Sequence, residues 1–217
     1  MQADFSVELG ADDRRLEVPW TSEDGSLRYY DLKRQPELLL QIEEAHHNRE
    51  LGEFLSAVNS PGSMLETAKC DTWTTDEILP EEEIYGAPWK YSSYIDLIFS
   101  DPHPRLSFEG HQNFSHRLVR LLHKVPEISA AAEFIVRRCS YHRQALSAGA
   151  AVNAAPIAAA ESSTEGFYFT LYLSGYGDDS DEARRHWGIA LKLVENAILQ
   201  LSATHRRGAD QTAPVIG

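Results

Sequence analysis

Residues 166–176 read GFYFTLYLSGY and alternate strictly between two kinds of side chain. An alternation with a period of two is typical of a β-strand whose two faces meet different surroundings. One face carries Phe167, Phe169, Leu171 and Leu173, and the other carries Tyr168, Thr170, Tyr172 and Tyr176, with Ser174 between the last two. The segment therefore predicts a sheet with one face packed against helices and an opposite face that carries tyrosines.

A second segment shows the same alternation. Residues 90–100 read KYSSYIDLIFS. Its side expected to face the helices carries Tyr91, Ile95, Leu97 and Phe99, and its opposite side carries Tyr94, Asp96 and Ile98. We expect the two segments to contribute to one tyrosine-bearing face.

The order of the predicted elements indicates two strand–strand–helix units. The first has strands at 64–73 and 90–100 and a helix at 111–125, and the second has strands at 131–142 and 166–175 and a helix at 180–203. Both helices carry an apolar stripe of the same spacing, which aligns Leu118 with Val194. Cys70 and Cys139 also fall at corresponding places. These matches predict an internal duplication, although any two amphipathic helices can be aligned in this way.

The first sixty residues contain strand patterns at 4–10, 15–20 and 27–32 and a helical pattern at 35–59. The apolar face of this helix changes side at the polar run HHNRE, so the helix bends there or its halves pack against different neighbours. Strand pairs that feed helices imply an α+β fold, with a largely antiparallel sheet and three main helices packed mainly on one face.

The chain is expected to form one domain, in which residues 1–60 pack on a core of residues 61–204. Residues 145–164 are rich in alanine and lack a regular apolar stripe, which predicts a mobile insertion between two strands. Residues 205–217 are interpreted as a tail.

Amino-acid composition indicates which kinds of partner the protein can bind and in which cellular compartment it is expected. The 217 residues include 33 acidic and 20 basic side chains, which gives a formal net charge of −13. An acidic surface repels phosphate backbones, so the sequence predicts no nucleic-acid partner, although a basic partner fits. No apolar run approaches the roughly 20 residues that span a membrane, and the N-terminal residues lack a signal-peptide pattern. With only two cysteines, we expect a cytoplasmic protein with reduced thiols and no membrane partner.

The stretch YLSGYGDDSDEARRHWG at 172–188 suggests a phosphate or metal loop, but a helix start explains it better. Asp179 and Glu182 have the spacing of a capping box, and carboxylates are favourable near a helix N-terminus. The same carboxylates would repel phosphate. We therefore interpret the stretch as an N-terminal cap.

Other candidate sites give weak signals. The pairs Glu43–His46 and Glu44–His47 have the spacing of half a di-iron motif, but a second copy is missing. Cys139 and His142 are an odd number of positions apart and so would point to opposite faces of a strand. His111 lies on an apolar helical face and is expected to pack there. The common phosphate, dinucleotide, hydrolase and zinc motifs are absent, so no catalytic residue, metal or cofactor is predicted.

The tyrosine-bearing face is the strongest functional feature of the sequence. Tyrosine offers a large contact area and a hydrogen-bonding tip, and it is enriched in interfaces. The predicted binding residues are Tyr94, Tyr168, Tyr172 and Tyr176. Arg138 and His142 join them only if a bulge changes the alternation that places Phe134 and Val136 inward.

These observations predict a non-enzymatic module that binds a protein partner or assembles with itself, as a homodimer, through the tyrosine-bearing face. Two alternatives stay open. One is an enzyme whose cleft is built from scattered histidines and carboxylates, and the other is an inhibitor of a basic protein. Tyrosines that simply suit a half-exposed strand would also explain the pattern.

Overall fold

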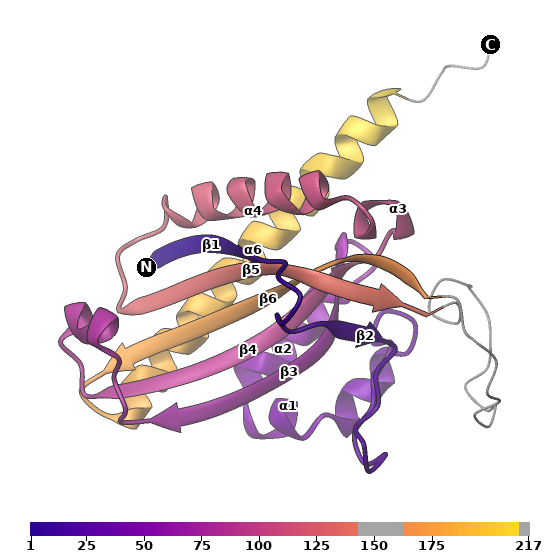
Figure 1. Cartoon of the computed structure of the whole chain (residues 1–217). Coiled ribbons are helices and arrows are strands. Elements are labelled where there is room, and N and C mark those ends of the chain that lie inside the picture. The colour runs from indigo at the N-terminus through magenta and orange to yellow at the C-terminus, as the bar shows by residue number, and fades with distance from the viewer. Residues whose placement is uncertain (143–162, 213–217) are drawn as a thin grey trace.

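A six-stranded mixed sheet organises the part of the chain that the computed structural model describes, residues 1–142 and 163–212 (Figure 1). The strand order is β1-β5-β6-β4-β3, and β2 also pairs with β5. The strands are β1 (Gln2–Glu8), β2 (Leu16–Val18), β3 (Leu65–Thr75), β4 (Trp89–Phe99), β5 (Ala130–Tyr141) and β6 (Thr164–Gly177).

The pairs β3–β4, β4–β6 and β5–β6 are antiparallel, whereas β1 and β2 run parallel to β5. Three helices cover one face of the sheet, namely α2 (Arg49–Val58), α4 (Phe108–Leu122) and α6 (Ser180–Thr212). The predicted α+β fold with a largely antiparallel sheet is confirmed.

The apolar faces of β4 and β6 meet the helices as predicted. Phe99, Phe169 and Leu171 lie in the main hydrophobic core together with Leu118 of α4 and Val194 of α6. Burial of these side chains supplies the main stabilisation of a sheet covered on one side.

Gly175 lets α6 approach β6 closely. A Cβ atom at this position would lie 2.2 Å from the Trp187 backbone nitrogen and 2.4 Å from the Ala183 carbonyl oxygen. The approach buries Trp187 completely, and its indole N–H donates to Ser93 Oγ at 2.9 Å. The glycine in the predicted strand is therefore required by packing.

The helix predicted at 35–59 is divided into three pieces, η1 (Pro36–Gln41), α1 (Glu43–His47) and α2. The break before α2 is at Asn48, whose backbone is extended and whose side chain is buried. Its amide donates to Thr72 Oγ1 at 3.1 Å, and its carbonyl accepts from the Tyr91 hydroxyl. These bonds to β3 and β4 favour the bend that the change of apolar face indicated.

Three further predictions need correction or fall outside the described residues. The strand expected at 27–32 is absent from the structure, which has only an isolated bridge between Thr21 and Arg28 there. The helix expected to end at residue 203 continues to Thr212, so the predicted tail is wrong up to that point. The insertion predicted at 145–164 lies outside the described residues except at its end.

Two short elements were not predicted, η2 (Pro80–Tyr85) and α3 (Pro102–Arg105). No helix in the described part of the chain combines the length and apolar character needed to cross a lipid bilayer.

The two predicted strand–strand–helix units are both present as an antiparallel strand pair with a helix on the same face of the sheet. Their places in the sheet differ, because β3 is an edge strand whereas β5 lies between β1 and β6. The cysteines, however, do not correspond. Cys70 packs toward the helices, whereas Cys139 is buried in a cluster on the opposite face. Duplication stays a prediction that rests on the helical stripes and the topology.

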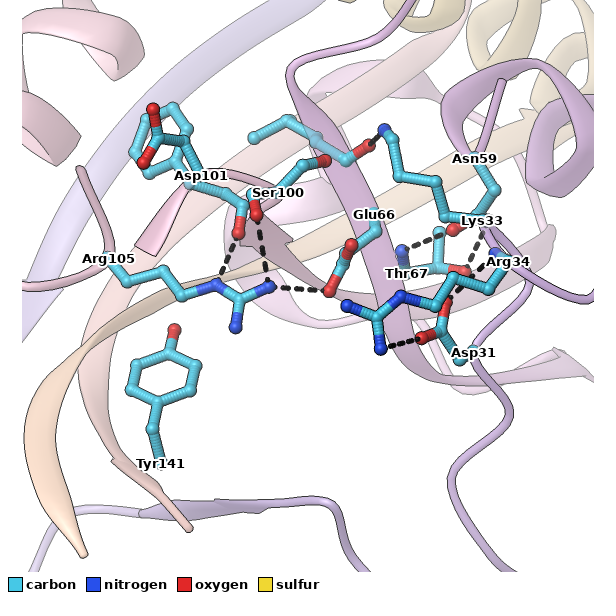
Figure 2. A network of polar contacts seen from close by, with 12 residues as sticks. Asp31, Lys33, Arg34, Asn59, Glu66, Thr67, Ser100, Asp101, Arg105 and Tyr141 are labelled. Atoms are coloured by element: carbon cyan, nitrogen blue, oxygen red, sulfur yellow. Dashed lines mark hydrogen bonds and ion pairs between the residues drawn. The ribbon is translucent and has the colours of Figure 1, made fainter. Parts of the chain in front are cut away.

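A buried polar network attaches the N-terminal segment to the sheet (Figure 2). The Arg105 guanidinium donates to Glu66 Oε1 at 2.7 Å and lies over the Tyr141 ring, 5.2 Å from its centroid. Lys33 donates to the carbonyl oxygens of Ser63 and Leu65 at 2.8 and 2.9 Å. The two Lys33 hydrogen bonds hold the segment that precedes η1 against the start of β3, and Arg105 joins α3 to β3.

Candidate functional site

The four predicted binding tyrosines all lie on the sheet face away from the helices, which we call the tyrosine face, but only two of them are accessible. Tyr94 and Tyr172 are half-buried, whereas Tyr168 and Tyr176 are 0% and 2% exposed. The predicted single patch of four tyrosines is therefore wrong for Tyr168 and Tyr176, which the protein's own chain covers.

Tyr168 is covered at one end of the face. It belongs to a cluster with Leu16 and Val18 of β2, and Trp20 packs against the same cluster. The Trp20 indole N–H donates to the Ala68 carbonyl oxygen at 2.7 Å, which fixes this segment across the sheet.

Tyr176 is covered at the other end by η2. Its ring stacks on Tyr85, with centroids 4.0 Å apart and planes 8° apart, and its hydroxyl donates to Glu82 at 2.7 Å. Lys90 donates to the same carboxylate at 2.7 Å. Partial burial opposes the charge of Glu82, but these hydrogen bonds and the Lys90 charge outweigh it and lower the pKa of Glu82.

Tyr94 and Tyr172 stand between these covered ends in one row across the sheet. The strand register places five side chains of the tyrosine face side by side in the order Asp71, Tyr94, Tyr172, Glu133 and Asp4. The tyrosine rings are 6.4 Å apart between centroids, and all three carboxylates are exposed. We call these five residues the acidic–aromatic row.

The next row toward η2 extends the accessible surface. Trp73 pairs with Ser92, and Ser92 pairs with Ser174, whose hydroxyl lies 2.8 Å from that of Ser92. Trp73 is 39% exposed on the edge strand β3, which is unusual for a side chain of its size. The middle of the face thus presents three aromatic side chains to solvent.

The row on the opposite side of the acidic–aromatic row from Trp73 contains a buried carboxylate, that of Asp96. Asp96 is 0% exposed, and its Oδ1 accepts from Thr170 Oγ1 at 2.7 Å. Arg137 donates to Thr170 Oγ1 at 2.9 Å and forms an ion pair with Glu8 at 2.7 Å. Burial raises the pKa of Asp96 despite the Thr170 hydrogen bond and the nearby cations.

Two guanidinium groups contact the tyrosine rings of the acidic–aromatic row. Arg14 Cζ lies 5.1 Å from the Tyr94 ring centroid, and Arg137 Cζ lies 5.7 Å from that of Tyr172. Both distances are within the range of cation–π attraction. The row can therefore accommodate guanidinium groups on its rings.

The conflict over Arg138 and His142 is resolved by the observed register. Arg138 pairs with Phe167 on the helix side, so it does not belong to the tyrosine face. His142 lies beyond β5, where its imidazole contacts the Glu17 carboxylate. The arginine of the tyrosine face is Arg137, which the alternation from Phe134 and Val136 would have identified.

The capping interpretation of residues 172–188 is supported by geometry. Asp179 Oδ1 accepts from the Glu182 backbone N–H at 2.8 Å. The Glu182 carboxylate accepts from the backbone N–H of Asp178 at 2.9 Å, one residue before the expected position. Within the described residues, no group of three or more histidine, cysteine or acidic side chains has a geometry that could hold a metal ion.

The remaining titratable candidates are the two cysteines and His111, of which Cys139 and His111 are buried and Cys70 is half-buried. Burial raises the pKa of both Cys70 and Cys139 to about 12, so neither thiol is prepared for nucleophilic attack. His111 is 0% exposed among aromatic rings of the core, as its apolar position predicted.

Two hollows of the described surface lie away from the acidic–aromatic row. One, of about 450 Å³, lies between α2 and α6 beside Glu50, Arg184 and Ile189. The other, of about 570 Å³, includes His123 and Glu127 in its lining. The His123 ring donates to the Ala3 carbonyl oxygen at 2.8 Å, which joins the end of α4 to β1.

Comparison with protein families, with curated proteins and with solved structures gives no match for this chain.

Proposed function

We propose that the protein is a binding module that docks a basic protein surface on the acidic–aromatic row. The observation that carries the proposal is the acidic–aromatic row, because half-exposed Tyr94 and Tyr172 lie between exposed carboxylates in the middle of a face whose two ends are covered. Tyrosines supply contact area with little loss of side-chain entropy, and surrounding carboxylates select cationic groups.

Charge favours a basic partner over self-association. A second copy placed face to face would bring the exposed Asp71, Glu133 and Asp4 of both chains together, and like charges at an interface are unfavourable. The net charge of −13 adds a long-range repulsion between copies and attracts a cationic protein. Inhibition of a basic enzyme would use the same surface.

An enzymatic role has less support in the geometry. The predicted cleft needs carboxylates and a histidine that converge on one hollow where substrate can sit. Of the two hollows described above, one has His123 in its lining, and the ring N–H of His123 already donates to the Ala3 carbonyl oxygen of β1. The two free thiols fit a reducing compartment, so we expect the partner to be cytoplasmic.

The proposal is tested by photo-crosslinking in the native cell. p-Benzoylphenylalanine replaces Trp73 in one variant and Leu40, which is 72% exposed on η1, in a control variant. We expect the Trp73 variant to capture a protein of basic isoelectric point that the Leu40 variant does not capture. Capture of the same proteins at both positions, or of an acidic protein, contradicts the proposal.

Affinity measurements with the purified partner then test the row. Tyr172→Ala should weaken binding at least about 30-fold, because truncation of a buried aromatic anchor costs about 2 kcal/mol or more. Asp71→Asn with Glu133→Gln should slow association and reduce its salt dependence, whereas Glu53→Gln on α2 should not. Wild-type affinity of Tyr172→Ala would exclude the row as the docking site.

A further inference from the structure

The buried carboxylate of Asp96 is incompletely satisfied. Its Oδ1 accepts from Thr170, but its Oδ2 has no hydrogen-bond partner among the described residues and is shielded from solvent. The Tyr168 hydroxyl, on the same face of the neighbouring strand, is also buried without a hydrogen-bond partner there. An unpaired buried acceptor is costly, and native proteins retain few of them without a functional reason.

Among the cations near this carboxylate, Arg14 does most to lower the pKa of Asp96. Its guanidinium lies over the Tyr94 ring at 5.1 Å, and Tyr94 is two positions before Asp96 on the same face of β4. Burial opposes the charge of Arg14, but attraction to Asp96 and a hydrogen bond with Tyr94 outweigh this effect and raise the pKa of Arg14.

Arg14 reaches the sheet from an exposed loop between β1 and β2. The loop is anchored on either side, where Arg138 donates to the Leu9 carbonyl oxygen at 3.1 Å and Arg15 pairs with Glu165 at 3.1 Å. Between these anchors, backbone groups of Gly10 and Asp13 bond within the loop, and the contact of Arg14 with Tyr94 joins the loop to the sheet through a side chain. Displacement of Arg14 would therefore leave the sheet hydrogen bonds intact.

The other cations of the face have fixed roles. Arg137 is bound by Glu8 and Thr170 and is only 6% exposed. Lys69 Nζ lies 4.9 Å from the Trp20 ring centroid, under the N-terminal segment. Arg14 differs from these two cations because it is exposed and lies on a loop outside the sheet, where it contacts the Tyr94 ring.

We propose that the Tyr94 ring and the Asp96 carboxylate form a subsite for a guanidinium group of the partner, and that Arg14 occupies this subsite in the free protein. The inference rests on the proposed docking of a basic protein. A guanidinium group is planar, stacks on an aromatic face and donates several hydrogen bonds, so it suits this pair better than an ammonium group. An internal occupant reduces the apparent affinity for an external one, because only the fraction of molecules with Arg14 displaced can bind.

The test uses N-acetyl-arginine methylamide as the probe, titrated into the ¹⁵N-labelled full chain, with N-acetyl-lysine methylamide as the comparison. Chemical shifts of the Tyr94, Asp96, Thr170 and Tyr172 amides report binding. Arg14→Ala should bind the arginine probe at least about tenfold more tightly than wild type and more tightly than the lysine probe. Arg184→Ala is the matched control, because Arg184 makes a similar contact, 5.9 Å from the Tyr91 ring, on the helix side.

Two further variants locate the subsite. In the Arg14→Ala background, Asp96→Asn and Tyr94→Leu should each remove the gain in affinity. Tyr94 is half-buried, so Tyr94→Leu keeps the test decisive if Asp96→Asn fails to fold. Unchanged affinity in Arg14→Ala, an equal gain in Arg184→Ala, or tight binding that survives Tyr94→Leu would overturn the subsite. The proposed function is judged separately. If the subsite is overturned but Tyr172→Ala still weakens binding of the natural partner, the proposed docking of a basic protein stands.

Discussion

His111 should make the fold sensitive to acid. It lies on α4 with its ring edge-on to Phe99, at 4.7 Å between centroids, and beside Phe169 at 4.5 Å. Its Nδ1–H donates to the Ser107 carbonyl oxygen at 2.8 Å, and its Nε2 is buried without a hydrogen-bond partner in the described structure. Burial in this aromatic pocket lowers the pKa of His111 from 6.5 to about 4.

The folded protein loses stability in acid because the unfolded chain takes up a proton at His111 more readily than the folded protein does. The unfolded chain binds a proton at this histidine below pH 6.5, whereas the folded protein does so only near pH 4. Stability from His111 is therefore complete above pH 6.5 and is lost as the pH falls toward 4. Because one pKa unit corresponds to about 1.4 kcal/mol, the complete loss is about 3 kcal/mol, and most of it should be reached by about pH 4.5.

Urea unfolding at pH 7 and pH 4.5 measures this loss for wild type and His111→Leu. The leucine variant keeps an apolar side chain of similar volume and removes the titrating group, so its free energy of unfolding should fall about 2 kcal/mol less than that of wild type between the two pH values. His205→Gln, at an exposed position of α6, should behave as wild type. Equal acid sensitivity of wild type and His111→Leu would refute the assignment of this effect to His111.

Two further predictions concern stability. Asp179→Ala should lower the free energy of unfolding by about 1 kcal/mol because it removes the hydrogen bond to the Glu182 N–H, and Asp179→Asn should lower it less. Thermal unfolding of the two variants measures both losses. A rise of the wild-type melting temperature with Mg²⁺ or Ca²⁺ that both variants lose would instead indicate a metal site. Arg105→Met should lower the free energy of unfolding by about 3–5 kcal/mol at pH 7, because it leaves the buried Glu66 carboxylate without its ion-pair partner. Adding Glu66→Gln should recover most of that loss in urea unfolding. A double variant as unstable as Arg105→Met would show that lost packing, and not the unpaired charge, causes the destabilisation.

The alternation of residues 90–100 and 166–176 predicted the orientation of β4 and β6 because each side chain's face depends only on local backbone geometry. The burial of Tyr168 and Tyr176 could not be predicted in the same way. It depends on contacts with Trp20, which lies just beyond β2, and with Tyr85, which ends the short helix η2. Both residues are far away in the sequence and belong to no pattern that points to the sheet. Local pattern therefore identified the face but not its accessible part.

The parallel pairing of β1 with β5 was likewise beyond reach, since it joins Gln2–Glu8 to a strand more than 120 residues away. The same pairing brings Asp4 beside Glu133, which completes the acidic–aromatic row, and Glu8 beside Arg137, which forms their ion pair. The sequence shows these carboxylates only as part of an acidic total. Their contribution to one surface arises from tertiary contacts between distant segments.

The distribution of cover over the tyrosine face bears on its function. The N-terminal segment and η2 cover Tyr168 and Tyr176, so the chain possesses elements able to shield apolar strands at both ends. The middle is left with accessible Trp73, and the carboxylates beside it discourage pairing of two identical faces. We therefore expect this accessible, aromatic and acidic surface to favour a cationic partner over a second copy or a nucleic acid.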